Sequence, residues 1–255
     1  MTAEPALRAT LDWLRKQPGV RYAEVRFVDT ETEHLRVRDG RPEQITAGAS
    51  RGAGIRVLAD RAWGFACSAD LGEGALREAA ARAVRVARAS SVVARAPVTF
   101  PEMAPSRGRY ATRVEIDPFG VDLADKLAVL DGPVRALRQG DARLVSAEAW
   151  MDWTRQRKHL LTTEGTDVEQ TFTFGACGMH VYARGDDGVS HRRSYPSWQG
   201  CDGFQAGYDR VGALDLASHV DAVRDEALAL LAAPPCPAGS RTLLLESSQV
   251  ALQLH

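Results

Sequence analysis

The sequence feature that most constrains the fold is a series of strand-like segments joined by short turns, after Gly140. The segments are Leu144–Trp153, Arg157–Thr163, Val168–Tyr182 and Val189–Ser197. Turn-forming clusters such as Gly185-Asp186-Asp187-Gly188 separate them. Consecutive strands with short connections pair mainly antiparallel. This half of the chain is therefore predicted to be a largely antiparallel sheet.

The N-terminal part alternates between helical and strand patterns. Leu7, Leu11 and Leu14 recur at helical spacing, which predicts a helix over Glu4–Gln17 that ends at Pro18-Gly19. Alternating residues predict four strands, with a hairpin turn at Asp39-Gly40 at the end of the second. These strands are Tyr22–Asp29, Glu33–Asp39, Ile55–Leu58 and Ala62–Cys67.

Three helices are predicted further along the chain. Asp70 is expected to cap the first, which runs to about Ala89, with Glu73 in a capping-box position. A second begins after Asp122 and is expected to be interrupted at Gly132-Pro133. The third covers Leu216–Leu231.

The region between Ala96 and Pro118 carries four prolines and no clear period, so we expect a connection between domains. The predicted fold class is α+β. A mixed α/β domain at 1–95 is followed by a linker at 96–120 and a mainly antiparallel β-rich central domain with flanking helices at 121–235. Residues 236–255 hold a short strand, Thr242–Leu245, and a helix that starts at Gln249 and runs to the last residue, as expected for the truncated start of a third, catalytic domain.

Composition narrows the function classes. The net charge is -1 and the basic residues are scattered, which argues against a nucleic-acid surface. No segment approaches the roughly 18 apolar residues of a membrane span, and the N-terminus does not have the pattern of a signal peptide. The four cysteines form no C-x-x-C pair, so we expect free thiols in a reducing, cytoplasmic compartment.

The short motifs are weak when each is taken alone. Gly52-Ala53-Gly54 lacks the third glycine of a dinucleotide fingerprint, and a strand rather than a helix follows it. The sequence has no Gly-x-Ser-x-Gly elbow. The histidines before the C-terminus are expected to be ordinary surface or hydrogen-bonded residues; they are His34, His159, His180, His191 and His219. Three tryptophans either pack in the core or line a groove; they are Trp150, Trp153 and Trp198.

Several longer motifs together resemble a known family. One is the pair Gly52–Leu58 and Ala62–Ala66, another is Thr163-Glu164-Gly165, and a third is the passage Leu230–Gly239. The chain resembles, over nearly its whole length, the TldD/PmbA family of metal-dependent peptidases, which are also called modulators of DNA gyrase. The resemblance implies the first two domains of such a protein, which shape a substrate channel and a subunit contact.

The resemblance also implies a metal centre. In the TldD branch, the helix after this passage carries a His-Glu-x-x-x-His motif, and alignment makes His255 its first histidine and the first zinc ligand. Zinc needs about three protein ligands and an open position for water, and the glutamate takes a proton from that water. The other ligands and the general base lie beyond residue 255, so no catalytic residue is assigned within the chain, and its 255 residues alone are expected to be inactive. A lone terminal histidine without a role is the alternative reading of His255.

Two functions stay open on the sequence. The first is the N-terminal portion of a zinc-dependent peptidase that cleaves peptides or unfolded small proteins. The second is a PmbA-like, non-catalytic partner subunit that shapes the substrate channel of a peptidase complex. In both cases the resemblance implies a homodimer or a heterodimer with a paralogue. Nothing in the sequence identifies the substrate or supports direct action on gyrase, DNA or a membrane.

Overall fold

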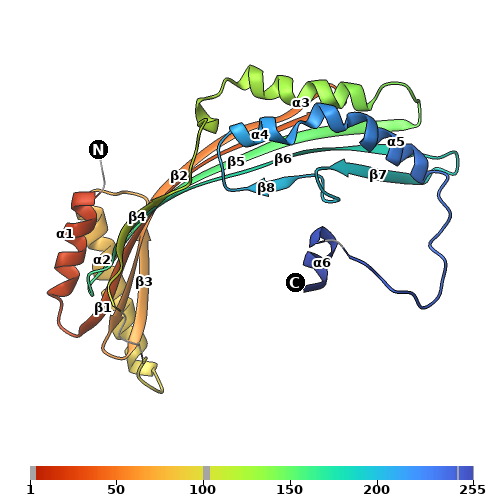
Figure 1. The fold of residues 1–255 in the computed structure, drawn as a ribbon. Helices are drawn as coiled ribbons and strands as arrows, with labels where there is room; N and C mark the ends of the chain where they lie inside the picture. Colours follow the sequence, from red (N-terminus) through yellow and green to blue (C-terminus); the bar gives the residue numbers. More distant parts are fainter. Residues whose placement is uncertain (1–3, 100–103, 246, 255) are drawn as a thin grey trace. The chain divides into compact units, whose positions relative to one another are not determined.

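In the computed structural model, residues 4–99, 104–245, 247–254 are described (Figure 1). The main path of the sheet runs in the order β3-β2-β1-β5-β6-β4, and β7 and β8 also pair with β6. Four long strands make up most of it: β1 (Val20–Arg38), β2 (Arg41–Ala59), β5 (Leu144–Thr162) and β6 (Asp167–Arg184). The chain divides into two compact units, and each long strand contributes residues to both.

The first unit, here called the α1 unit, consists of Met1–Glu31, Gly48–Thr112 and Thr154–Thr173. Besides the long strands it contains α1 (Glu4–Arg15), β3 (Ala62–Ser68), α2 (Glu73–Val93) and β4 (Arg107–Ala111). The two helices contact each other, and α2 packs on β3. Gly64 of β3 lies so close to α2 that a Cβ there would overlap the backbone of Ala83 and Ala87. The core of this unit includes Leu7, Leu14, Val25, Ile55, Val57, Leu76, Ala83 and Leu161.

A ladder of polar side chains joins β1 to its neighbour β5 in this unit. The Arg155 guanidinium lies 2.6 Å from a Glu31 oxygen, and that of Arg157 lies 3.7 Å from Asp29. Between them the Gln156 amide donates to the Thr30 hydroxyl at 3.2 Å. These cross-strand contacts keep a highly polar stretch within the sheet.

The second unit, here called the α3 unit, consists of Thr32–Ala47, Arg113–Trp153 and Phe174–His255. Its further elements are η1 (Pro118–Gly120), α3 (Leu123–Leu137), β7 (Ser190–Tyr195), β8 (Asp202–Phe204), α4 (Asp209–Leu214), η2 (Leu216–His219), α5 (Val220–Leu230) and α6 (Ser247–Leu254). Helices α3, α4 and α5 cover one face of this unit's sheet (Figure 1). The core between them includes Leu35, Leu130, Val134, Ala147, Met151, Trp153, Met179, Val211 and Val223.

The structure confirms the α+β class, the mainly antiparallel sheet and the hairpin at Asp39-Gly40, where both residues have positive φ. Among the described residues, no helix is both long enough and apolar enough to cross a bilayer. The predicted division at 1–95, 96–120, 121–235 and 236–255 stays a prediction.

Four local predictions were wrong. β1 and β5 are each one continuous strand, because the polar ladder bridges the expected breaks. α3 continues through Pro133. The free energy lost with the missing proline N–H is smaller than the free energy gained by burying the apolar face of the helix. The expected linker also contains β4, which pairs in parallel with β6, and the linker itself stays a prediction. The N-cap of α2 is Gly72 rather than Asp70, whose carboxylate instead accepts from the Gly72 N–H at 2.8 Å. The predicted strand at Thr242–Leu245 has no regular secondary structure.

Candidate functional site

The predicted metal ligand, His255, lies outside the described residues. Among the residues that are described, no three His, Cys, Asp or Glu side chains come together in a group that could hold a metal ion. The described part of the chain therefore does not fit a zinc centre by itself, and no catalytic step through a metal follows from it.

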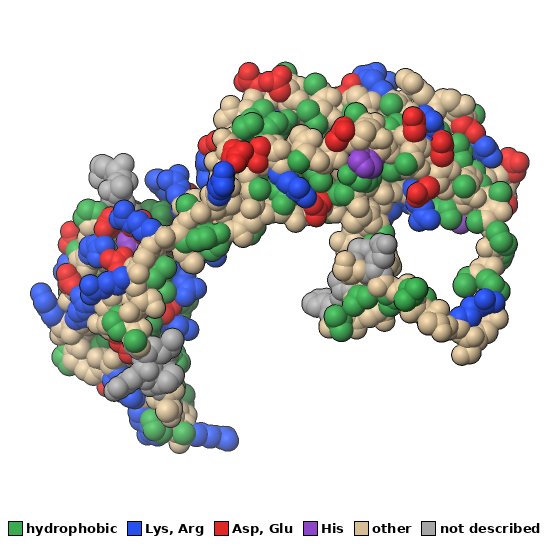
Figure 2. Space-filling model, in the orientation of Figure 1, with side chains coloured by type: hydrophobic (Ala, Val, Ile, Leu, Met, Phe, Trp, Pro, Cys, Tyr) green, Lys and Arg blue, Asp and Glu red, His purple; other side chains and the backbone are tan. Residues whose placement is uncertain are grey.

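The most developed concave surface lies in the α1 unit, between α1 and the sheet. A first groove of about 510 Å³ is lined by Glu4, Leu7, Phe27, Asp29, Arg51, Leu71, Arg109, Arg157, Lys158, His159, Glu169, Gln170 and Thr171. A second groove of about 400 Å³ is lined by Arg8, Leu11, Asp12, Arg15, Arg107, Leu161, Thr162, Gly165, Thr166 and Asp167. Seven of these lining residues are Arg or Lys and five are Asp or Glu, so the two grooves together are mildly basic. Figure 2 shows Lys and Arg side chains spread over this unit.

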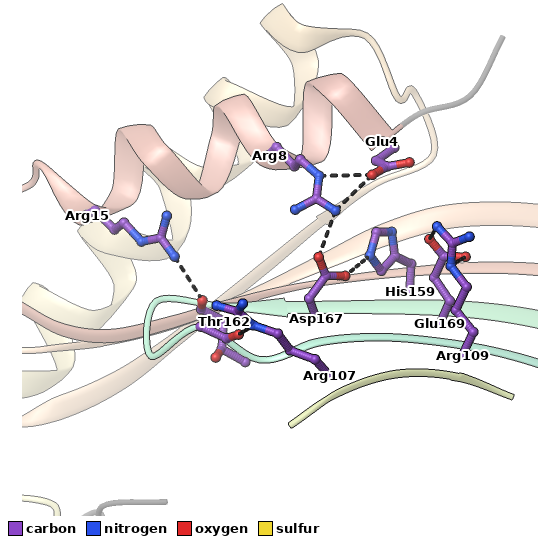
Figure 3. A network of polar contacts seen from close by, with 10 residues as sticks. Glu4, Arg8, Arg15, Arg107, Arg109, His159, Thr162, Asp167 and Glu169 are labelled. Carbon is purple, nitrogen blue, oxygen red and sulfur yellow. Dashed lines mark hydrogen bonds and ion pairs between the residues drawn. The ribbon is translucent and has the colours of Figure 1, made fainter. Parts of the chain in front are cut away.

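A chain of polar contacts connects α1 to the sheet between the grooves (Figure 3). Arg8 donates to Glu4 one turn earlier, at 2.8 and 2.9 Å, and to Asp167 of β6 at 2.7 Å. The other oxygen of Asp167 lies 2.8 Å from Nε2 of His159 on β5, which is buried. The hydrogen bonds from His159 and Arg8 lower the pKa of the Asp167 carboxyl. The network thus fixes the N-terminal half of α1 on the sheet.

Arginines from α1 and β4 surround this network. Nη2 of Arg15 lies 3.3 Å from the Thr162 carbonyl oxygen, and Nε of Arg107 lies 3.3 Å from the Gly165 carbonyl oxygen. Arg109 forms an ion pair with Glu169 of β6 at 3.3 Å, yet its side chain remains 79% exposed. Both β4 arginines therefore keep guanidinium groups accessible to a ligand.

The side chains that line the grooves are suited to binding a ligand. Their described lining contains no Ser and no Cys. Two of the threonine hydroxyls are structural acceptors, because Thr162 Oγ1 accepts from the Thr166 N–H and Thr166 Oγ1 accepts from the Ser106 N–H. These two hydroxyls are therefore already engaged by backbone N–H groups. The exposed side chains instead offer charged and hydrogen-bonding groups.

Three histidines are hydrogen-bonded as the sequence predicted, whereas His180 is neither at the surface nor hydrogen-bonded through its Nδ1. His159 is hydrogen-bonded to Asp167, His34 lies 3.0 Å from Asp152, and His219 stacks on the Tyr195 ring. His180 is buried between aromatic rings, and burial together with nearby arginines lowers its pKa to about 4. None of these histidines belongs to a metal-binding group of described residues.

The tryptophans and glycines also take structural roles. Trp153 is buried in the core of the α3 unit, and Trp150 packs edge-on against His180. Trp198 keeps 40% of its surface exposed. Gly52-Ala53-Gly54 lies within β2, paired in part with β3, which excludes the strand-to-helix turn of a dinucleotide site.

Comparisons with known proteins agree with the fold, and one of them matches part of the chain to a domain of a known family. Residues 23–87 match the family described as PmbA/TldA metallopeptidase domain 1. The chain is 22% identical over 234 residues to a metalloprotease of Methanocaldococcus jannaschii, covering 92% of this chain and 50% of that protein. It is 24% identical over 236 residues to a metalloprotease of Methanothermobacter thermautotrophicus, covering 92% of this chain and 49% of that protein.

A solved structure from Thermotoga maritima, named "putative modulator of a DNA gyrase", has the same fold. Its TM-score is 0.69 at 18% identity, over 93% of this chain and 50% of that one. The resemblance to the TldD/PmbA family is thereby confirmed: the matched domain is of the metallopeptidase type, and the fold is that of TldD/PmbA proteins. The chain spans about half the length of the relatives that it matches.

Proposed function

We propose that this chain is the N-terminal portion of a zinc-dependent peptidase that acts on peptides or unfolded small proteins. The match of residues 23–87 to a metallopeptidase domain carries the proposal, and the two relatives named metalloproteases support it. His255 is the proposed first zinc ligand. The described residues contribute binding surfaces and no metal-binding group, so the remaining ligands and the general base belong to other residues of the peptidase.

The same proposal includes the setting of the enzyme. A cytoplasmic location fits the four free cysteines, since no pair among them forms a disulfide. A dimer, with itself or with a paralogue, and a peptide substrate are proposed from the family resemblance. The non-catalytic partner subunit is the competing proposal, and the experiment below separates the two.

The test uses the full-length gene product that contains these 255 residues. It compares the zinc content and the peptide hydrolysis of the unaltered protein with those of two variants. Zinc is measured by atomic absorption after dialysis, and hydrolysis with an unstructured peptide library read by mass spectrometry. His255→Ala should remove most of the bound zinc and all of the hydrolysis, because a three-ligand site that loses one ligand no longer holds the ion.

The matched control is His191→Ala. His191 lies on β7, paired with Ala183 of β6, and belongs to no metal-binding group of described residues. It should leave zinc and activity unchanged. A full-length protein without zinc or hydrolysis would favour the partner subunit, and an active His255→Ala variant would remove this residue from the site.

A further inference from the structure

The edge strand β4 has an open row of backbone hydrogen-bonding groups. It is the last strand on the main path of the sheet, and none of the described strands pairs with its outer edge. The Asp167 N–H donates to the Ser106 carbonyl, and the Thr112 N–H donates to the Thr171 carbonyl. With the register Arg107↔Asp167, this direction of the ladder leaves the N–H and C=O groups of Arg107, Arg109 and Ala111 on the outer edge.

The residues with outward backbone groups also line the grooves. Arg109 borders the first groove, and Arg107 borders the second. Both side chains lie on the face of the sheet that α1 covers, as Figure 3 shows for their positions beside Asp167 and Glu169. A strand added to β4 would thus lie along two hollows that accept alternate side chains.

The charges around this edge indicate which kind of ligand would bind there. Arg107 contacts a carbonyl oxygen and no described carboxylate, while the Arg109 pair with Glu169 is largely exposed and hence weak. Arg113, just beyond the strand, keeps 89% of its side chain exposed. Pairing with the β4 strand of a second copy would bring these arginines together, which disfavours that occupant. Carboxylates at alternate positions of an incoming chain would match them.

From these observations we infer that the outer edge of β4 (Arg107–Ala111) binds an extended acidic polypeptide segment by strand addition. The backbone of the ligand pairs with the outward groups of β4. Its alternate carboxylates meet Arg107 and Arg109 in the two grooves. This binding needs no metal and goes beyond the proposed peptidase activity, so it is measured on the 255-residue chain alone.

The ligand experiment uses fluorescence anisotropy with a fluorescein-labelled peptide of about eight residues, the length of an ordinary strand, in which Glu alternates with Thr. We expect saturable binding with a dissociation constant on the order of 100 µM or tighter at low salt. Two control peptides separate the contributions. Replacing Glu by Lys should abolish binding, and N-methylation of alternate backbone amides should weaken it at least about tenfold.

Two variants test the protein side. Arg107→Glu with Arg109→Glu should weaken binding at least about tenfold. The matched control is Arg85→Glu with Arg95→Glu, which changes the net charge equally at exposed positions outside the lining of both grooves. This control should leave peptide binding unchanged. Ala111→Pro keeps every charge and removes an outward N–H without removing a bond to β6. It should weaken binding as strongly as the N-methylated peptide does, with Ala111→Ser as its control.

Far-UV circular dichroism verifies that each variant is folded, and the modified peptides test the same contacts on the unaltered protein. Three results would overturn the inference: no saturation at about 1 mM peptide, equal binding of the N-methylated and parent peptides, or equal binding of the Arg107/Arg109 variant and its control. Equal binding of the N-methylated peptide would show a purely ionic contact, as any polyanion would make. If the full-length protein held no zinc and hydrolysed no peptide while the 255-residue chain still bound this peptide, the proposed peptidase function would be wrong and this inference would stand.

Discussion

The buried ion pair between Lys126 and Glu33 offers a sharp test of how the α3 unit is held together. Lys126 of α3 is 1% exposed, and its Nζ lies 2.5 Å from a carboxylate oxygen of Glu33 on β1, whose side chain is 19% exposed. The pair joins a helix to the sheet across the core side of the unit. Replacing Glu33 by Leu would leave the ammonium group buried without its counter-charge.

The size of the effect follows from this burial. Removing one partner of a buried pair costs about 3–5 kcal/mol, because the remaining charge loses its compensation. Since Glu33 keeps about a fifth of its exposure, we expect the lower end, about 3 kcal/mol. Adding Lys126→Met to Glu33→Leu removes both charges and fills the space with apolar atoms. The double variant should therefore return to within about 1 kcal/mol of the original protein.

Urea unfolding, followed by circular dichroism and tryptophan fluorescence, measures these differences. With a slope near 2–3 kcal/mol/M, Glu33→Leu should lower the midpoint by about 1 M or more. The matched control is Glu73→Leu, which removes the exposed partner of Arg77 on α2 and should cost no more than about 0.5 kcal/mol. Equal losses in Glu33→Leu and Glu73→Leu, or a double variant no more stable than Glu33→Leu alone, would refute the reasoning.

Three further predictions follow from close packing and burial. Gly64→Ala should destabilise the protein by about 2–3 kcal/mol in urea unfolding, because the added methyl group overlaps the α2 backbone; an unchanged midpoint would contradict the close approach. In native protein at pH 8, iodoacetamide should label the exposed Cys67 and Cys236 and spare Cys177, because burial raises the pKa of its thiol to about 12; mass spectrometry of the labelled peptides decides. The pKa of His180 falls from 6.5 to about 4 on folding, so the unfolded chain takes up the proton first as the pH falls. Stability should drop by about 2–3 kcal/mol between pH 7 and pH 4, and His180→Phe should remove most of that drop; equal pH profiles would show that this histidine does not titrate as described.

Local patterns in the sequence were sufficient for some elements and misleading for others. The spacing of Leu7, Leu11 and Leu14 predicts α1 because all three bury on one side. The polar run in the middle of β1 gives no strand signal, since its partners lie more than 120 residues away on β5. Such a ladder can be recognised only when the two strands are placed side by side. Each polar segment on its own has the composition of a loop.

The grooves of the α1 unit show the same limit for function. Arg8, His159 and Asp167 come from three separate elements, and no spacing in the sequence indicates that they meet. β4 was hidden for a different reason. Its five residues are all exposed, so they carry no apolar alternation, and prolines surround them. An edge strand of this kind is specified by the backbone of β6 beside it rather than by its own side chains. Its side chains are therefore available for another task, and the arginines at alternate positions are what makes an acidic partner strand the ligand to test.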